Sequence, residues 1–128
     1  MPGASLAGLE ADGVVAVIGT VVNPAGLTHA KAVPIGRARA FANPGMGASP
    51  VFHAFAIDQT GIVFGEGTGV IGDQRIRIDP AALRDIGDGL VWAPGDFFGQ
   101  DGSPDPYCSR GALQRVRRRL ADAGLESL

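Results

Sequence analysis

The chain has 128 residues and a mass of 13.1 kDa, which is the size of one domain. Apolar residues make up 45% and charged residues 19%, a balance that excludes a disordered or purely polar chain. The net charge of −2 argues against nucleic acid as a partner, and the longest apolar stretch (residues 13–22) is too short to cross a membrane. There is no secretory signal pattern, and a lone cysteine cannot form an internal disulfide, so we expect a reduced, cytoplasmic domain.

The first third of the chain predicts a hairpin between two short helices. Residues 5–12 carry leucines three apart, which favours a short helix. Residues 13–22 are rich in β-branched side chains, and residues 27–33 alternate between two faces, so both predict strands. The turn sequence at residues 23–26 joins them as a hairpin. Residues 34–42 predict a short helix that ends before Pro44.

The middle of the chain predicts mainly strands. We expect strands at residues 51–57, 62–64, 71–78 and 90–93, the last resuming at 97–98, and one or two helical turns at 81–86. Arginine and isoleucine alternate over residues 75–78, which is typical of a half-buried strand.

The last element is a helix. Apolar residues spaced three, four and three apart form one face: Leu113, Val116, Leu120 and Ala123. Arginines 115, 117, 118 and 119 lie mostly on the other side, as a solvated or intersubunit face. Ser109, or Asp105 with Pro106, is expected to cap the start, and Gly124 the end. The element order indicates an α+β fold, with a mixed sheet holding one face against helix.

A literal G-x-G-x-x-G motif spans residues 67–72. A dinucleotide site needs this loop to open a helix whose N-terminal amides hold the pyrophosphate. Residues 73–78 alternate like a strand instead, so we interpret the motif as a flexible glycine loop between strands.

Metal and nucleophile signals are weak. His29 and His53 are 24 residues apart without a nearby cysteine, and prolines interrupt the acidic loop at Asp101 and Asp105, so no metal site is expected within this chain. Cys108 has no marked histidine or asparagine partner and is expected to be a half-buried residue in the first turn of a helix.

The segment 43–50 mixes proline and glycine between a helix and a predicted strand. A loop held firmly at both ends is how many scaffolds present functional residues. The same composition also suits a generic connector, and both interpretations stay open.

Several stretches, taken in order, form a larger pattern: residues 14–22, 27–34, 45–52, 72–80, 92–96 and 101–104, followed by the final helix. This ordered set, covering about residues 13–125, resembles the N-terminal domain of glutamine synthetases. It is similar above all to actinobacterial-type glutamine synthetase-like enzymes, some of which glutamylate amines other than ammonia. The resemblance implies a β-grasp fold for a single domain over residues 1–128. It also implies that the catalytic domain, with its ATP, glutamate and Mg²⁺ or Mn²⁺ sites, is absent from this chain.

The resemblance further implies a function in nitrogen metabolism. The full-length protein is expected to be a cytoplasmic, ring-forming homo-oligomer and an ATP-dependent ligase that forms γ-glutamyl phosphate. This domain alone is expected to be inactive and to hold no cofactor. Its partner is expected to be the catalytic domain of the same or a neighbouring subunit, with neither nucleic acid nor membrane involved.

One loop carries the implied substrate contact. In the family it usually reads Asp-Gly-Ser-Ser, completes the neighbouring subunit's active site, and uses its aspartate to bind and deprotonate ammonium. The matching residues here are Met46, Gly47, Ala48 and Ser49. A thioether cannot attract a small cation as a carboxylate does, so we expect another amine as acceptor in preference to ammonia, which stays the alternative. Asp73 falls where the family has an aspartate that helps hold this loop.

A different interpretation is that the protein has no catalytic activity. β-grasp domains also serve as stand-alone protein-interaction modules, and this chain offers a sheet edge and an arginine-bearing helix for a partner.

Overall fold

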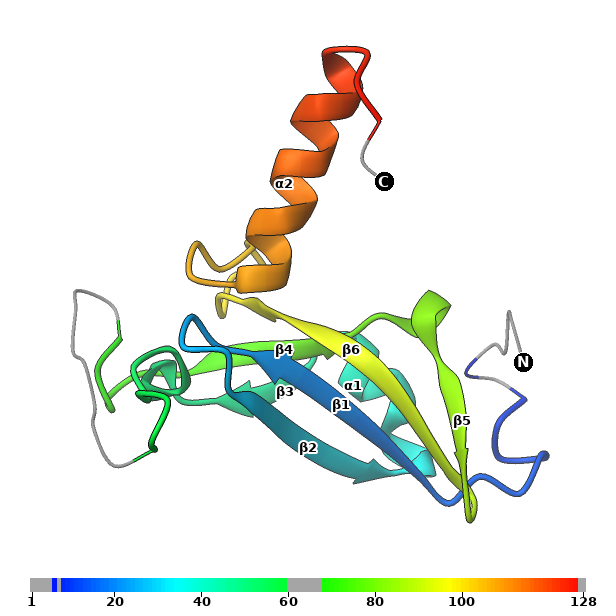
Figure 1. Ribbon diagram of the computed structural model, residues 1–128. Coiled ribbons are helices and arrows are strands. Elements are labelled where there is room, and N and C mark those ends of the chain that lie inside the picture. The colour runs from blue at the N-terminus through cyan, green and yellow to red at the C-terminus, as the bar shows by residue number, and fades with distance from the viewer. Residues whose placement is uncertain (1–5, 7, 60–67, 127–128) are drawn as a thin grey trace.

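The computed structural model describes residue 6 and residues 8–59 and 68–126 (Figure 1). The predicted strand at residues 62–64 lies outside this part of the chain. The described residues form six strands: β1 (Ala16–Val22), β2 (Thr28–Pro34), β3 (Met46–Ala48), β4 (Gln74–Ile78), β5 (Arg84–Gly87) and β6 (Leu90–Phe98). The helices are α1 (Ala38–Ala42) and α2 (Ser109–Asp122), with short 3₁₀ turns η1 (Ile35–Arg37), η2 (Pro50–His53) and η3 (Pro80–Ala82).

The strands form one curled mixed sheet in the order β2-β1-β6-β4-β3, with β5 also pairing with β6. β1 and β2 make the predicted antiparallel hairpin, and β1 runs parallel to β6 at the centre. β5 pairs with the start of β6 and β4 with its end. Parallel first and last strands with a helix against the sheet are the β-grasp arrangement, so the predicted α+β, β-grasp fold is confirmed.

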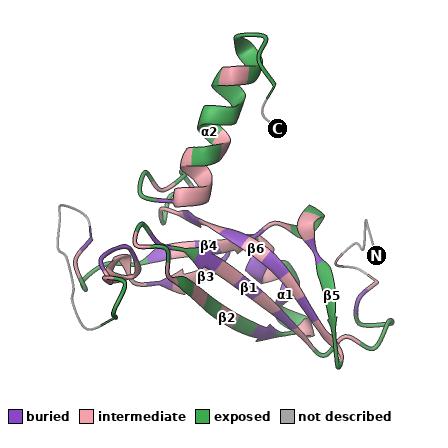
Figure 2. Cartoon of the chain, viewed as in Figure 1, coloured by how far each residue is buried: buried purple, intermediate pink, exposed green. Residues whose placement is uncertain are grey.

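The core lies between the sheet and α1. Strands β1, β4 and β6 alternate between buried and partly exposed residues, as a sheet with one packed face requires (Figure 2). Phe41 of α1 is fully buried and lies directly over Gly19 of β1. A Cβ at residue 19 would stand 2.4 Å from Phe41 Cζ and 2.5 Å from Ile78 Cγ2, so only glycine admits this contact.

Several sequence predictions are wrong in detail. Residues 51–57 form no strand; η2, which begins at Pro50, occupies the first three of these positions, because Ser49 accepts the Val51 N–H and Pro50 supplies the first helical φ. The helical turns predicted at 81–86 shrink to η3, and β5 follows. The helix predicted at residues 5–12 is replaced in its described part by hydrogen-bonded turns that bury Leu9.

α2 projects away from the sheet (Figure 1). None of its residues, all of which are described, is buried; Leu113 is 59% and Val116 50% exposed. Its cap differs from the prediction, because Cys108 occupies the N-cap position and its Sγ accepts the Gly111 N–H, in place of Ser109 or Asp105. No helix in the described part of the chain has the length and apolar character that crossing a membrane requires.

Candidate functional site

The segment predicted to carry the substrate contact, residues 46–49, lies at the edge of the sheet. β3 is the last strand in the order and pairs with β4 alone among the described strands, with Met46 opposite Ile76 and Ala48 opposite Gln74. Successive strand residues face opposite sides, so Met46 and Ala48 point to the core, where Ala48 is buried and Met46 packs against it. Gly47 faces the other side of the sheet.

Contacts with α1 and β4 fix the backbone that leads into this loop. α1 ends at Ala42, and the Gly45 N–H donates to Ala40 O at 2.8 Å. Gly45 has φ of +97°, and a Cβ there would stand 2.6 Å from Ile76 O. A residue with a side chain is therefore both strained and sterically excluded at position 45. The backbone enters β3 along one defined path.

Three side chains hold the loop itself. Lys31 Nζ of β2 donates to Gly47 O. Gln74 Nε2 donates to Ser49 O at 3.3 Å, and Ser49 Oγ donates to Val70 O at 3.3 Å while accepting the Val51 N–H. The loop is thus tied to β2, to β4 and to the segment before β4.

Asp73 stands beside Gly47, at the start of β4. Its Oδ1 lies 3.1 Å from the place a Cβ of residue 47 would occupy. Its Oδ2 accepts from Gln100 Nε2 at 2.6 Å and lies 3.8 Å from Arg75 Nη2. Arg75 Nη2 in turn donates to Gln100 Oε1 at 3.1 Å. The structure therefore places Asp73 next to the loop, in a polar cluster on the face of the sheet away from the core.

A second, buried cluster lies behind the loop. His53 of η2 is 7% exposed and Gln74 only 3%. His53 Nε2 lies 3.2 Å from Gln74 Oε1 and 3.4 Å from Asp105 Oδ1, and its ring packs on Phe97 at 4.3 Å. Sequence reasoning placed His53 on a strand, so it missed this cluster. The only local signal was a histidine among apolar residues.

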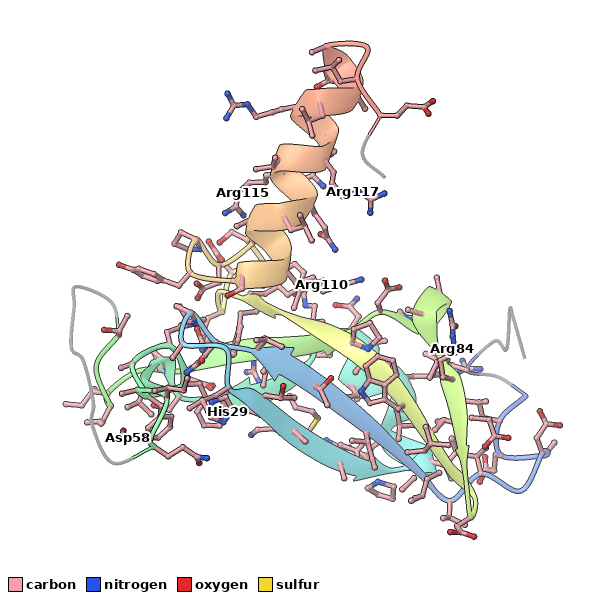
Figure 3. All side chains as sticks on the ribbon, in the orientation of Figure 1. His29, Asp58, Arg84, Arg110, Arg115 and Arg117 are labelled. Atoms are coloured by element: carbon pink, nitrogen blue, oxygen red, sulfur yellow. The ribbon has the colours of Figure 1, made fainter. Side chains whose placement is uncertain are left out.

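The base of α2 is pinned by one arginine. Arg110 Nη1 donates to Asp96 Oδ2 at 2.5 Å and Nη2 to Asp79 Oδ2 at 2.9 Å, bridging β6 and the residue after β4. Figure 3 shows Arg110 at the end of α2 nearest the sheet. Cys108 is buried beside this bridge, and its Sγ accepts from the Phe97 N–H. Burial raises the pKa of the Cys108 thiol, so it lacks the thiolate that a nucleophile needs.

His29 of β2 packs in a group of aromatic side chains with Phe52 and Phe55. Its ring stacks on Phe52 with centroids 5.0 Å apart and lies 5.7 Å from the ring of Phe55. Asn23 holds this segment by donating to the carbonyls of both phenylalanines. Burial lowers the pKa of His29 from its ordinary value of 6.5, which favours the neutral ring.

The other residues and motifs that the sequence suggested as functional sites do not gather at one place. The described part of the glycine motif, residues 68–72, leads into β4 rather than a helix, as expected. Within residues 8–59 and 68–126, no three His, Cys, Asp or Glu side chains converge as metal ligands. Arginines 115, 117, 118 and 119 are exposed on the projecting α2.

Comparison with known proteins identifies a curated relative that matches most of this chain. The γ-glutamylpolyamine synthetase GlnA3 of Streptomyces coelicolor is 35% identical in an alignment of 114 residues that covers 84% of this chain and 24% of that protein. The chain therefore spans about a quarter of the length of this curated relative. No protein-family model matches the chain.

Solved structures share the fold. A glutamine synthase homologue superposes with a TM-score of 0.71 at 22% identity, over 86% of this chain and 27% of that one. GmaS bound to ADP gives 0.73 at 20%, over 96% and 26%, and Plasmodium falciparum glutamine synthetase gives 0.69 at 16%, over 97% and 24%.

Proposed function

Because this chain belongs to the glutamine synthetase family as its N-terminal domain, we propose that residues 46–49 form the amine-facing wall of an active site completed by the catalytic domain of a neighbouring subunit in a ring. The position and rigidity of the loop support this proposal. β3 pairs with β4 alone among the described strands, and three side-chain anchors hold it in place. Such a preformed loop presents its atoms to a substrate without first having to be ordered.

The proposed reaction is γ-glutamyl transfer. The glutamate γ-carboxylate attacks the γ-phosphate of ATP and displaces ADP. The amine nitrogen then attacks the γ-carbonyl carbon, and inorganic phosphate leaves as the C–N bond forms and the amine loses a proton. In this proposal ATP and the divalent metal bind to the catalytic domain; within residues 8–59 and 68–126 no three His, Cys, Asp or Glu side chains converge as metal ligands. This domain alone is then inactive.

The absence of a carboxylate from residues 46–49 supports an amine larger than ammonia as acceptor. Met46 packs its thioether against the core and offers no charge to a small cation. An alkyl amine gains apolar contact that ammonium cannot make, because burial of each methylene contributes about 0.8 kcal/mol. The printed name of the Streptomyces relative, a γ-glutamylpolyamine synthetase, points in the same direction.

Phosphate release by the longer protein that contains this chain tests the acceptor. With glutamate, ATP and Mg²⁺ present, we expect faster release with alkyl amines or polyamines than with ammonium. Ammonium as the preferred acceptor of the unaltered enzyme would contradict the proposal.

Mixed oligomers test whether the loop acts on a neighbour. One subunit carries Gly45→Val, which blocks the path into β3, and the other carries an inactivating change in the catalytic domain. If the loop serves the adjacent subunit, mixing the two inactive proteins restores part of the activity. Mixtures that stay inactive would place the loop in its own subunit's site.

The exposed face of α2 favours a second candidate, a protein-interaction module without catalysis. Its apolar residues and arginines are open to solvent in this structure. The reading frame distinguishes the two: a natural stop after Leu128 supports the module, and a frame that continues through a domain with acidic metal ligands supports the ligase.

A further inference from the structure

A path of polar contacts, largely buried, connects three segments that are far apart in the sequence. It runs from Asp105, just before α2, through His53 of η2 to Gln74 of β4, and ends at the carbonyl of Ser49. The side chain of His53 is 1% exposed, so water does not replace these contacts cheaply. No step of the proposed reaction uses His53 directly.

The acceptors around His53 determine which ring nitrogen carries the proton. Nε2 faces two oxygens, Gln74 Oε1 at 3.2 Å and Asp105 Oδ1 at 3.4 Å. Asp105 is itself fixed, because its Oδ1 accepts the Tyr107 N–H at 2.8 Å and its own N–H donates to Phe97 O. Nδ1 is buried and meets no hydrogen-bond partner in the described part of the chain. The proton therefore resides on Nε2, which donates toward the two oxygens.

This donor in turn sets the orientation of the Gln74 amide. With Oε1 facing the His53 N–H, the amide nitrogen must face Ser49 O, which it does at 3.3 Å. If the amide were reversed, its NH₂ group would face the His53 N–H, and its oxygen would face the Ser49 carbonyl oxygen. Gln74 can thus donate to the loop because His53 holds its other end.

We propose that His53 is a positioning residue: acting through Gln74, it fixes the end of the 46–49 loop relative to the base of α2. The consequence for catalysis depends on the proposed function, whereas the path of polar contacts itself is a property of this chain. Removing the donor at position 53 frees the Gln74 amide to rotate and releases the Ser49 carbonyl. Because Asp105 precedes α2, the same path makes the position of the loop depend on the base of that helix.

Nuclear magnetic resonance of the unaltered chain tests the path without reference to any activity. We expect His53 to be protonated on Nε2 and the Gln74 side-chain amide to exchange slowly with solvent. His53→Phe keeps the ring packed on Phe97 but removes the donor, so the Gln74 amide should lose its protection; His53→Gln restores a donor and should recover it. Protonation on Nδ1, or an unprotected Gln74 amide in the unaltered chain, overturns the inference even if His53→Phe fails to fold.

Kinetics of the longer protein test the consequence. For His53→Phe we expect the KM for the amine to rise about tenfold with little change in kcat, the factor that corresponds to loss of about 1.4 kcal/mol, one hydrogen bond. His53→Gln should recover the KM. His29→Phe, the other histidine, should leave it unchanged at a pH where His29 is neutral. If the path is present but the amine KM does not move in His53→Phe, the role of the loop in amine binding is wrong, which overturns the proposed function and leaves the path standing.

Discussion

Replacement of Gly19 by alanine tests how α1 is seated on the sheet. The new Cβ would lie 2.4 Å from Phe41 Cζ and 2.5 Å from Ile78 Cγ2, well inside contact distance. Both neighbours are buried, at 0% and 3% exposure, so neither ring nor methyl can move aside into solvent. Phe41 lies one residue before the end of α1, so any displacement also shifts the start of the segment that leads to residues 46–49.

The expected cost follows from two opposing effects. Overpacking a core by one methyl group costs about 1–3 kcal/mol. Replacing glycine in a strand recovers about 0.5–1 kcal/mol by restricting the unfolded chain. We expect a net loss of about 1–2 kcal/mol in the free energy of unfolding, or about 4–8 °C in Tm for a domain of this size.

Urea unfolding followed by circular dichroism measures this loss. Gly36→Ala is the matched control, because no heavy atom lies within 4 Å of a Cβ at residue 36. Phe41→Leu, which makes room under the sheet, should cost less in the Gly19→Ala background than alone. If Gly19→Ala is as stable as the unaltered chain or the control, the close approach of Phe41 to the sheet is wrong.

Three further results are expected. Arg110→Met removes both ion pairs to Asp79 and Asp96 and should lower the free energy of urea unfolding by about 1–2 kcal/mol; a change below about 0.5 kcal/mol would show that the bridge does not hold α2. Because the pKa of His29 is lowered in the folded state, the unfolded chain binds more protons, so stability should be complete above pH 6.5 and fall as pH drops below it. Stability curves for His29→Phe should be flatter over that range, and equal slopes would refute the assignment. Cys108 is 3% exposed with a raised thiol pKa, so a thiol reagent should label the folded chain slowly and the urea-unfolded chain completely; fast labelling of the folded chain would contradict its burial.

Sequence patterns were sufficient for the elements with strong local periodicity. The β1–β2 hairpin, β4, the start of β6 and α2 all lie where alternation or a 3.6-residue spacing predicted them. The β-grasp fold followed from the family resemblance and agreed with the element order. The role of residues 46–49 and of Asp73 remains a prediction, which the geometry makes testable.

Local patterns failed where distant contacts compete with them. Residues 51–57 alternate like a strand, yet the Ser49 cap starts a 3₁₀ turn and the Asn23 amide holds the carbonyls of Phe52 and Phe55. A strand there would lose these bonds. The hydroxyl and amide that decide the conformation lie outside the alternating segment, which is why its own pattern was misleading.

By itself the sequence determined the elements with strong periodicity, such as the β1–β2 hairpin, β4 and α2, since periodic apolar spacing is a property of consecutive residues. Only the tertiary structure decided that Gln74, His53 and Asp105 meet behind the loop. Gln74 is 21 positions from His53 and Asp105 is 52, so no local spacing brings them together. It also decided that the apolar face of α2 stays open to solvent. Periodicity marks a face as apolar, but what that face contacts depends on where the sheet and the base of the helix direct it.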